Sequence, residues 1–199
     1  NGKIVDGSIK FKGQDLGKLS SEALRDIRGN EIAMIYQEPM ASLNPAMKIV
    51  NQLMEVPMIH EGISKDEAYK RALEVVNDVK LPDPERILKS FPHQLSGGQQ
   101  QRLTIARALS HQPEVLCLDE FSIAIDPVTT MRIEDVLKEL RQEMTIILVT
   151  NLVQQARRLA DRTMFMLNGE VVEIGDTEPM FSGNAKQAKT NAFLSGDFG

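Results

Sequence analysis

The stretch Leu95-Ser96-Gly97-Gly98-Gln99-Gln100-Gln101-Arg102 decides the fold, and the apolar-periodic run 103–109 continues it as a helix. A serine and two glycines that open a helix predict an anion site, because free backbone N–H groups and the positive end of the helix dipole point outward together. A short apolar strand, Val115-Leu116-Cys117-Leu118, follows and ends in Asp119-Glu120. An acidic pair at the carboxyl end of a buried strand is a typical place for a magnesium ligand and a catalytic base. Together the two features predict nucleotide chemistry.

The rest of the sequence alternates between strand and helix patterns, which predicts a layered α/β architecture. Strands are expected at 8–11, 32–36 and 145–149, and a hairpin at 163–174 with Asn168-Gly169 as its turn. The strand at 145–149 is fully apolar, as in a strand buried in a parallel sheet. Helices are expected at 21–27, 96–110 and 129–141, in much of 48–90, and after Gly175. Within 48–90, Ser64-Lys65-Asp66-Glu67 predicts a capping box.

The composition narrows the class of function only mildly. The 199 residues suffice for one sizeable core, or a core with a smaller lobe. The formal charge of −5 argues against a nucleic-acid binder, which would need a basic face. Cys117 is the single cysteine, so no disulfide framework is expected and a buried, inert thiol is predicted. His60 and His93 have no acidic or cysteine partner at ligand spacing, which favours surface or loop positions over a metal site.

The signature stretch carries a family resemblance. LSGGQQQR followed by VLCLDE resembles the signature motif and the Walker B strand of ATP-binding-cassette (ABC) ATPases, and the likeness runs along almost the whole chain. The resemblance implies a P-loop-type parallel sheet with a helical subdomain, and ATP and Mg²⁺ as cofactors. It implies that Asp119 holds magnesium and that Glu120 polarises the water that attacks the γ-phosphate.

The same resemblance assigns the remaining site residues. Ser96, Gly97, Gly98 and Gln99 would bind the γ-phosphate of a nucleotide held by the opposite subunit, so turnover would need a head-to-tail dimer. Gln37 matches the Q-loop glutamine, which reaches the magnesium and the attacking water. Asp126 matches the D-loop aspartate that couples the two sites.

The resemblance also implies an organisation and partners. Residues 1–39 would hold the N-terminal strands and the Q-loop, 40–94 the helical subdomain, 95–174 the signature helix, Walker B strand and core sheet, and 175–199 a helical tail. The expected partners are a second ABC ATPase subunit, membrane permease subunits and, indirectly, a solute-binding protein, with no nucleic acid. The expected location is the cytoplasmic side of the cell membrane, because no apolar run approaches the roughly 20 residues that span a bilayer and no signal-peptide pattern is present.

Two regions indicate different transported solutes. The run Met40-Ala41-Ser42-Leu43-Asn44-Pro45, with IYQEP before it, is similar to the Q-loop of dipeptide, oligopeptide and nickel importer ATPases. The tail Phe193-Leu194-Ser195-Gly196-Asp197-Phe198-Gly199 looks more like the end of a phosphate importer ATPase.

The sequence departs from the family pattern in three places. No G-x-x-x-x-G-K-[ST] motif occurs, so the chain is expected to begin just after the Walker A helix and to bind ATP poorly alone. Thr150-Asn151 stands where the family has a switch histidine, and the deletion of one residue is expected to rotate the following helix by about 100° unless the loop absorbs it. Phe121 and Ile123 replace smaller D-loop residues and are expected to alter the geometry of that loop.

Three functions follow from these patterns. The first is the ATP-binding subunit of an ABC importer for peptides or a similar small solute. The second is a non-catalytic ABC-like protein that supplies only a signature half-site or a partner contact. The third is an ABC-type ATPase that acts on DNA, against which the short helical lobe and the absence of long heptad repeats argue.

Overall fold

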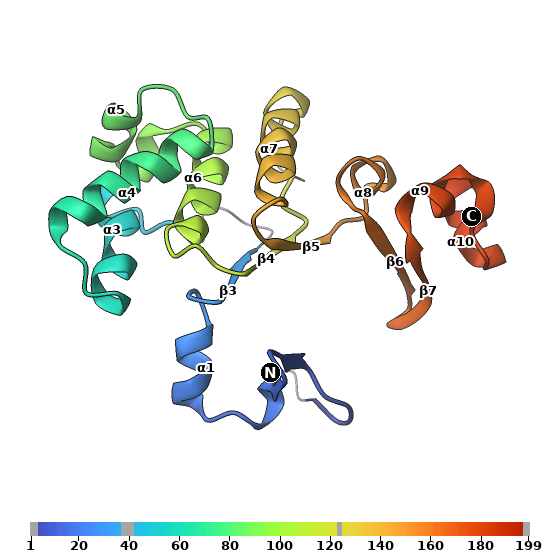
Figure 1. The fold of residues 1–199 in the computed structure, drawn as a ribbon. Coiled ribbons are helices and arrows are strands. Elements are labelled where there is room, and N and C mark those ends of the chain that lie inside the picture. The colour runs from blue at the N-terminus through green and yellow to red at the C-terminus, as the bar shows by residue number, and fades with distance from the viewer. Residues whose placement is uncertain (1–3, 37–41, 123–124, 197–199) are drawn as a thin grey trace.

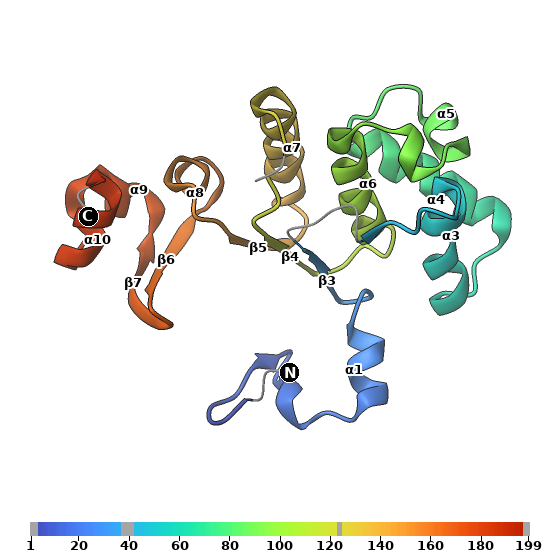
Figure 2. The ribbon, with the colours of Figure 1, turned by 180° about the vertical axis from the view of Figure 1, so that it is seen from behind.

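A three-stranded parallel sheet lies at the centre of the computed structural model, which describes residues 4–36, 42–122 and 125–196. Its order is β3 (Ile32–Ile35), β4 (Val115–Asp119) and β5 (Thr145–Val149). The helices α6 (Gly97–Leu109) and α7 (Pro127–Leu140) lie on one side of this sheet in both opposite views, and α1 (Ser21–Ile27) lies on the other side (Figures 1 and 2). The predicted parallel sheet is confirmed.

One face of the sheet forms the main core. On this face, Ala33 of β3 is in register with Leu116 of β4, and Ile35 with Leu118. All four residues are almost fully buried. They belong to the same apolar cluster as Leu103 and Ile105 of α6 and Ile133 and Leu137 of α7. Apolar residues at helical spacing on α6 and α7 therefore anchor both helices to this face, because each such side chain gains roughly 1.5–3 kcal/mol on burial.

The opposite face of the sheet is exposed. Met34, Cys117 and Ile147 are in register on it, and Met34 and Ile147 are 49% and 51% exposed. The prediction that residues 145–149 form a fully buried strand is therefore wrong, since only one face of β5 is covered by the described residues. Cys117 is only half-buried, contrary to the prediction of a buried thiol, although partial burial still raises the pKa of that thiol.

A helical group packs beside the β3 end of the sheet (Figure 1). It contains α3 (Ile49–His60), α4 (Lys65–Asp78) and α5 (Pro84–Lys89), with α6 alongside. The predicted capping box of α4 is confirmed: Glu67 N–H donates to Ser64 Oγ at 3.3 Å, and Ser64 N–H donates to Glu67 Oε2 at 2.9 Å. Residues 40–94 are thus mainly helical where described, while the division into four segments stays a prediction.

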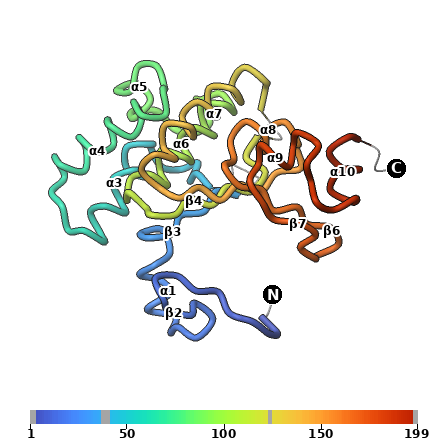
Figure 3. Tube along the Cα trace, turned by 45° about the vertical axis from the view of Figure 1, so that its right-hand side comes forward, coloured from blue at the N-terminus to red at the C-terminus, as the bar shows by residue number. Residues whose placement is uncertain are grey.

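The two ends of the chain lie away from the central sheet. The N-terminal segment forms the short antiparallel pair β1 (Lys10–Phe11) and β2 (Gln14–Asp15), the turn η1 (Leu16–Lys18) and α1, and connects to the sheet through β3 (Figure 3). Beyond β5 come α8 (Val153–Leu159) and the predicted hairpin, β6 (Arg162–Leu167) and β7 (Glu170–Asp176). Its turn residues Asn168 and Gly169 have φ of +51° and +82°, as a tight hairpin turn requires.

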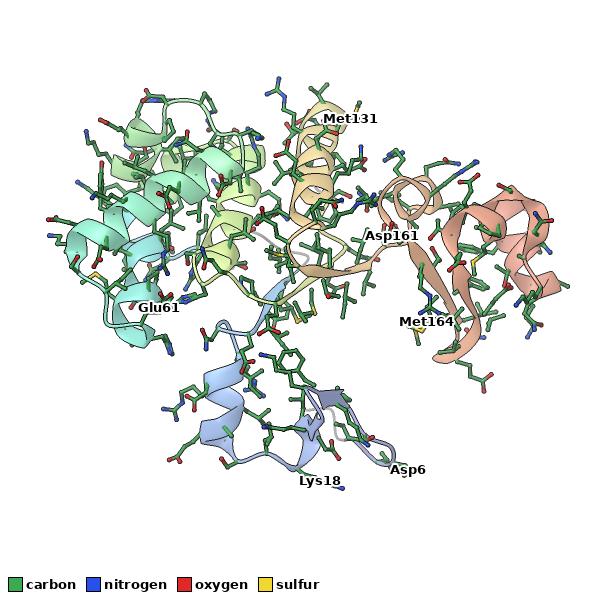
Figure 4. The ribbon with its side chains drawn as sticks, viewed as in Figure 1. Asp6, Lys18, Glu61, Met131, Asp161 and Met164 are labelled. Atoms are coloured by element: carbon green, nitrogen blue, oxygen red, sulfur yellow. The ribbon has the colours of Figure 1, made fainter. Side chains whose placement is uncertain are left out.

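The C-terminal region packs on the hairpin. It consists of α9 (Thr177–Pro179), the irregular turn η3 (Met180–Asn184) and α10 (Ala188–Ser195). The rings of Phe165 and Phe193 stack at 4.8 Å between centroids and join β6 to α10. Met164, on the other side of β6, is 51% exposed (Figure 4). Within the described ranges, no helix has both the length and the apolarity that crossing a membrane demands.

Candidate nucleotide site

The start of α6 is closed by a neutral capping box. Ser96 is the N-cap; its Oγ accepts from Gln99 N–H at 3.3 Å, and Gln99 Oε1 accepts from Ser96 N–H at 3.0 Å. The short 3-10 turn η2 (Pro92–Gln94) leads into it. The N–H groups of Gly97 and Gly98 have no acceptor within the part of the chain that the structure describes. They are the groups that an anion would bind, in a first turn without any acidic residue.

The two glycines of this turn have different surroundings. A Cβ built at Gly98 would lie 2.6 Å from Cγ2 of Thr129, a distance that no real contact tolerates, so Gly98 permits α6 to approach α7 closely. A Cβ built at Gly97 meets nothing within 4 Å. Packing therefore explains the glycine at 98 and not the glycine at 97, where a side chain would have room.

The acidic pair lies where β4 ends. Asp119 is the last residue of the strand and pairs with Val149 of β5, and both Asp119 and Glu120 are half-buried. Glu120 N–H donates to Val149 O at 2.9 Å, and Glu120 has φ of +46°, an uncommon left-handed conformation for a residue other than glycine. The chain therefore turns sharply at Glu120, directly after the strand.

Two buried amide side chains hold the residues after Glu120. Gln101 of α6 is fully buried and its Nε2 donates to the carbonyl of Phe121 at 2.9 Å. Gln155 of α8 is 1% exposed and its Nε2 donates to Ser122 Oγ at 3.0 Å. Sequence reasoning missed both glutamines, because their partners lie far away in the chain and no local pattern identifies them. Phe121 itself is 1% exposed, so the bulky ring is part of the core.

Asp126 caps α7. Its Oδ1 accepts from Thr129 N–H at 2.9 Å, and hydrogen bonds from the hydroxyl and N–H of Thr129 hold the pKa of the Asp126 carboxyl below its usual value. α7 consequently begins at Pro127, two residues before the predicted start at Thr129. Thr129 also packs against Gly98. Asp126 is therefore connected, through Thr129, to the first turn of α6.

These contacts join the first turns of α6 to the segment that follows β4. The first turns of α6 reach Phe121 and Thr129, both of which follow Glu120 in the chain. The position of the expected histidine, Thr150-Asn151, follows β5 at the same edge, where Thr150 Oγ1 accepts from Leu152 N–H at 3.0 Å and α8 begins. Gln37 and Ile123 lie outside the described residues, so the roles expected for them stay predictions.

The residues of this edge suit magnesium and a polyphosphate. Carboxylate oxygens such as those of Asp119 and Glu120 are preferred ligands of Mg²⁺, which is held by one or two carboxylates together with phosphate oxygens. The uncapped N–H groups of Gly97 and Gly98 suit a phosphate. Across the described ranges, no group of three or more His, Cys, Asp or Glu side chains is arranged to hold a metal, so an all-protein metal centre of that kind is not found there.

Comparison with known proteins places this arrangement in a family. The sequence profile described as ABC transporter matches residues 2–122, more than half of the chain. The chain belongs to the ABC transporter family. The resemblance of the signature and Walker B stretches is thereby confirmed.

Solved structures and curated relatives agree with this family. The ATP-binding cassette MJ0796, solved as a dimer in a post-hydrolysis state bound to ADP and Pi, matches with a TM-score of 0.76 and 30% identity, over 87% of this chain and 75% of that one. The predicted cassette fold is thus confirmed for part of a cassette.

The curated relatives are named for peptide import. A putative peptide import ATP-binding protein of Brucella abortus is 40% identical, over 89% of this chain and 54% of the relative. The oligopeptide transport ATP-binding protein OppD of Bacillus subtilis is 41% identical, over 90% of this chain and 51% of the relative. The chain thus spans about half the length of these relatives. Their names lend no support to the DNA-acting or the non-catalytic alternative.

Proposed function

We propose that these residues are part of the ATP-binding subunit of an ABC importer that couples ATP hydrolysis to uptake of peptides or a similar small solute. The observation that carries this proposal is that one chain holds both an anion-accepting helix start and, at the end of β4, the carboxylates of Asp119 and Glu120, with Gln101 of that helix bonded to Phe121 after them. The names of the relatives support peptides rather than nickel or phosphate as the solute class.

In this function each residue of the edge has a distinct task. Asp119 helps to hold Mg²⁺, which when bound offsets the negative charge of the phosphates. Glu120 orients and polarises the attacking water from its fixed place after β4. The N–H groups of Gly97 and Gly98, with the Ser96 hydroxyl, bind the γ-phosphate of a nucleotide held by a second subunit, and Asp126 links the two sites.

The partners and location follow from the same proposal. A second cassette subunit, arranged head to tail, would complete each nucleotide site, and permease subunits would receive the energy of hydrolysis. A solute-binding protein would deliver the solute to the permeases. The subunit would lie on the cytoplasmic face of the membrane. Because the 199 residues contain no G-x-x-x-x-G-K-[ST] motif, we propose that they bind and turn over ATP poorly alone.

The signature half of the site can be tested with a matched pair of caps. Ser96→Arg and Ser64→Arg each remove an N-cap serine from a capping box, and each is expected to cost about 1 kcal/mol of stability. The measurement is the Mg²⁺-dependent ATPase rate of a cassette subunit that carries the P-loop motif, with and without this chain. Wild type and Ser64→Arg are expected to stimulate that rate, and Ser96→Arg is expected to abolish the stimulation. Unchanged stimulation by Ser96→Arg would refute the assignment.

The hydrolytic half is tested on the chain alone. Weak ATP binding and slow turnover are expected, measured by calorimetry and phosphate release. Micromolar binding with Mg²⁺-dependent turnover that Glu120→Gln abolishes would overturn the proposal that the chain needs an added P-loop, while it would support the role of Glu120.

A further inference from the structure

The residues that follow Glu120 are held from both sides by buried side chains of different helices. Gln101 of α6 donates to the carbonyl of Phe121 at 2.9 Å, and Gln155 of α8 donates to the hydroxyl of Ser122 at 3.0 Å. Both glutamines are at most 1% exposed, and Phe121 and Ser122 are also buried. Water therefore does not compete for either hydrogen bond, and losing one leaves a buried polar group without its partner.

Gln155 is itself fixed by an ion pair. Its Nε2 also lies 3.2 Å from Oε1 of Glu134, a carboxylate that is 2% exposed. Arg158, one turn further along α8, donates to both oxygens of Glu134, from Nε at 2.8 Å and from Nη2 at 2.6 Å. The bidentate pair joins α7 to α8 and orients the glutamine toward Ser122.

Glu120 is unusually dependent on these neighbours. Its φ of +46° places it at a sharp turn in a conformation that surrounding structure must enforce. Its N–H group is held by Val149 on one side, and the two residues after it are held by Gln101 and Gln155 on the other. The path of the backbone at Glu120 therefore depends on where Phe121 and Ser122 are held.

We propose that Gln101 and Gln155 are positioning residues, which act through Phe121 and Ser122 to hold the Glu120 carboxylate in its working orientation. This inference rests on the proposed function, in which Glu120 polarises the attacking water. Because Gln155 lies on the helix that follows β5, it also links the ends of β4 and β5.

The first test measures how firmly the turn at Glu120 is held, on the chain without nucleotide. Amide hydrogen exchange at Glu120, which donates to Val149, is followed by NMR in wild type, Gln101→Met and Gln155→Met. Methionine keeps the side-chain length and removes the amide. Exchange at Glu120 is expected to rise about threefold to tenfold in each variant, as one net hydrogen bond implies.

A matched control separates positioning from general destabilisation. Gln52 of α3 is 2% exposed, and its Nε2 donates to the carbonyls of Asn44 and Met47, both at 2.9 Å. Gln52→Met makes the same chemical change in another region and should leave exchange at Glu120 at the wild-type rate. Ser122→Ala is a milder variant, which should raise exchange at Glu120 in the same direction. Wild-type exchange at Glu120 in Gln155→Met and Ser122→Ala would overturn the proposal.

The second test measures catalysis. In Gln155→Met the kcat of the chain for ATP is expected to fall about tenfold or more, with KM unchanged, because small displacements of a reacting group are costly. The control Gln52→Met should leave kcat at the wild-type value, and an equal fall in that variant would count against action through Glu120. If wild type has no measurable turnover alone, as the missing P-loop motif would explain, exchange at the Glu120 amide decides the positioning role.

Discussion

Substituting alanine for Gly98 provides the sharpest test of how the signature turn is packed. The added methyl group would lie 2.6 Å from Cγ2, 3.2 Å from Oγ1 and 3.3 Å from Cβ of Thr129. Thr129 occupies the first turn of α7, where Asp126 Oδ1 accepts from its N–H group. Either the two helices separate or the Asp126 cap is distorted, and overpacking of this kind costs about 1–3 kcal/mol. Replacement of a helical glycine by alanine returns about 0.5–1 kcal/mol, so the net loss is about 0–2.5 kcal/mol.

The assay is urea unfolding followed by circular dichroism, with two further variants. Gly97→Ala makes the same change one residue earlier, where nothing lies within 4 Å, and its stability should equal or slightly exceed that of wild type. Thr129→Ser removes Cγ2 and keeps the hydroxyl group, so the double variant Gly98→Ala/Thr129→Ser should recover most of the loss. A Gly98→Ala protein as stable as Gly97→Ala, or a double variant with purely additive losses, would refute the packing explanation.

Three other substitutions test the electrostatics of the fold. Gln99→Glu should raise the free energy of unfolding by about 0.3–1 kcal/mol through the dipole of α6, and should weaken stimulation of a P-loop-bearing cassette, since the new carboxylate competes with phosphate. Burial lowers the pKa of His111 despite nearby Glu61, so the unfolded chain takes up the proton first and stability should fall below about pH 6.5, by at most about 1.4 kcal/mol per pH unit; His111→Leu should flatten this slope in urea titrations at pH 5 and 7. Arg158→Ala should cost about 1–3 kcal/mol at pH 7, because Glu134 stays buried without its partner. Burial raises the pKa of Glu134, but hydrogen bonds from Arg158 and Gln155 outweigh burial and hold that pKa below its usual value. The difference from wild type should therefore shrink as pH falls below about 4.5, and a pH-independent difference would contradict this.

Local signals in the sequence predicted local structure well. The capping box at Ser64 was predicted because it depends on residues three positions apart. Ser96 and Gln99 have the same spacing and form a second box, which was not predicted. The start of α7 was predicted two residues late because Asp126 was assigned to nucleotide coupling, although Asp126-Pro127 is also an N-cap followed by a proline at the first helical position. One aspartate can satisfy both patterns, and only the structure shows its hydrogen bond.

Features that depend on distant contacts could not be predicted. The partners of Gln101 and Gln155 lie 20 and 33 residues away, and nothing near either glutamine in the sequence identifies them. Residues 97 and 98 are both glycines, yet only Gly98 lies close to another helix. The apolar strand 145–149 indicated burial on both faces, but the coverage of each face depends on other segments of the chain, and the described residues cover one.

The two capping boxes differ in the charge of their first turns, and that difference explains why only one of them suits a phosphate. In α4 the box is closed by Glu67, whose carboxylate accepts from Ser64 N–H, while Asp66 adds a second negative charge to the first turn. These charges already offset the positive end of that helix dipole. In α6 the equivalent residue is Gln99, and the first turn carries no acidic residue. Both hydrogen bonds of this capping box are therefore formed, but no acidic side chain in the first turn offsets the positive end of the helix dipole. An incoming phosphate can supply the missing negative charge at Gly97 and Gly98 without displacing the cap, which is the property an anion site at a folded helix end must have.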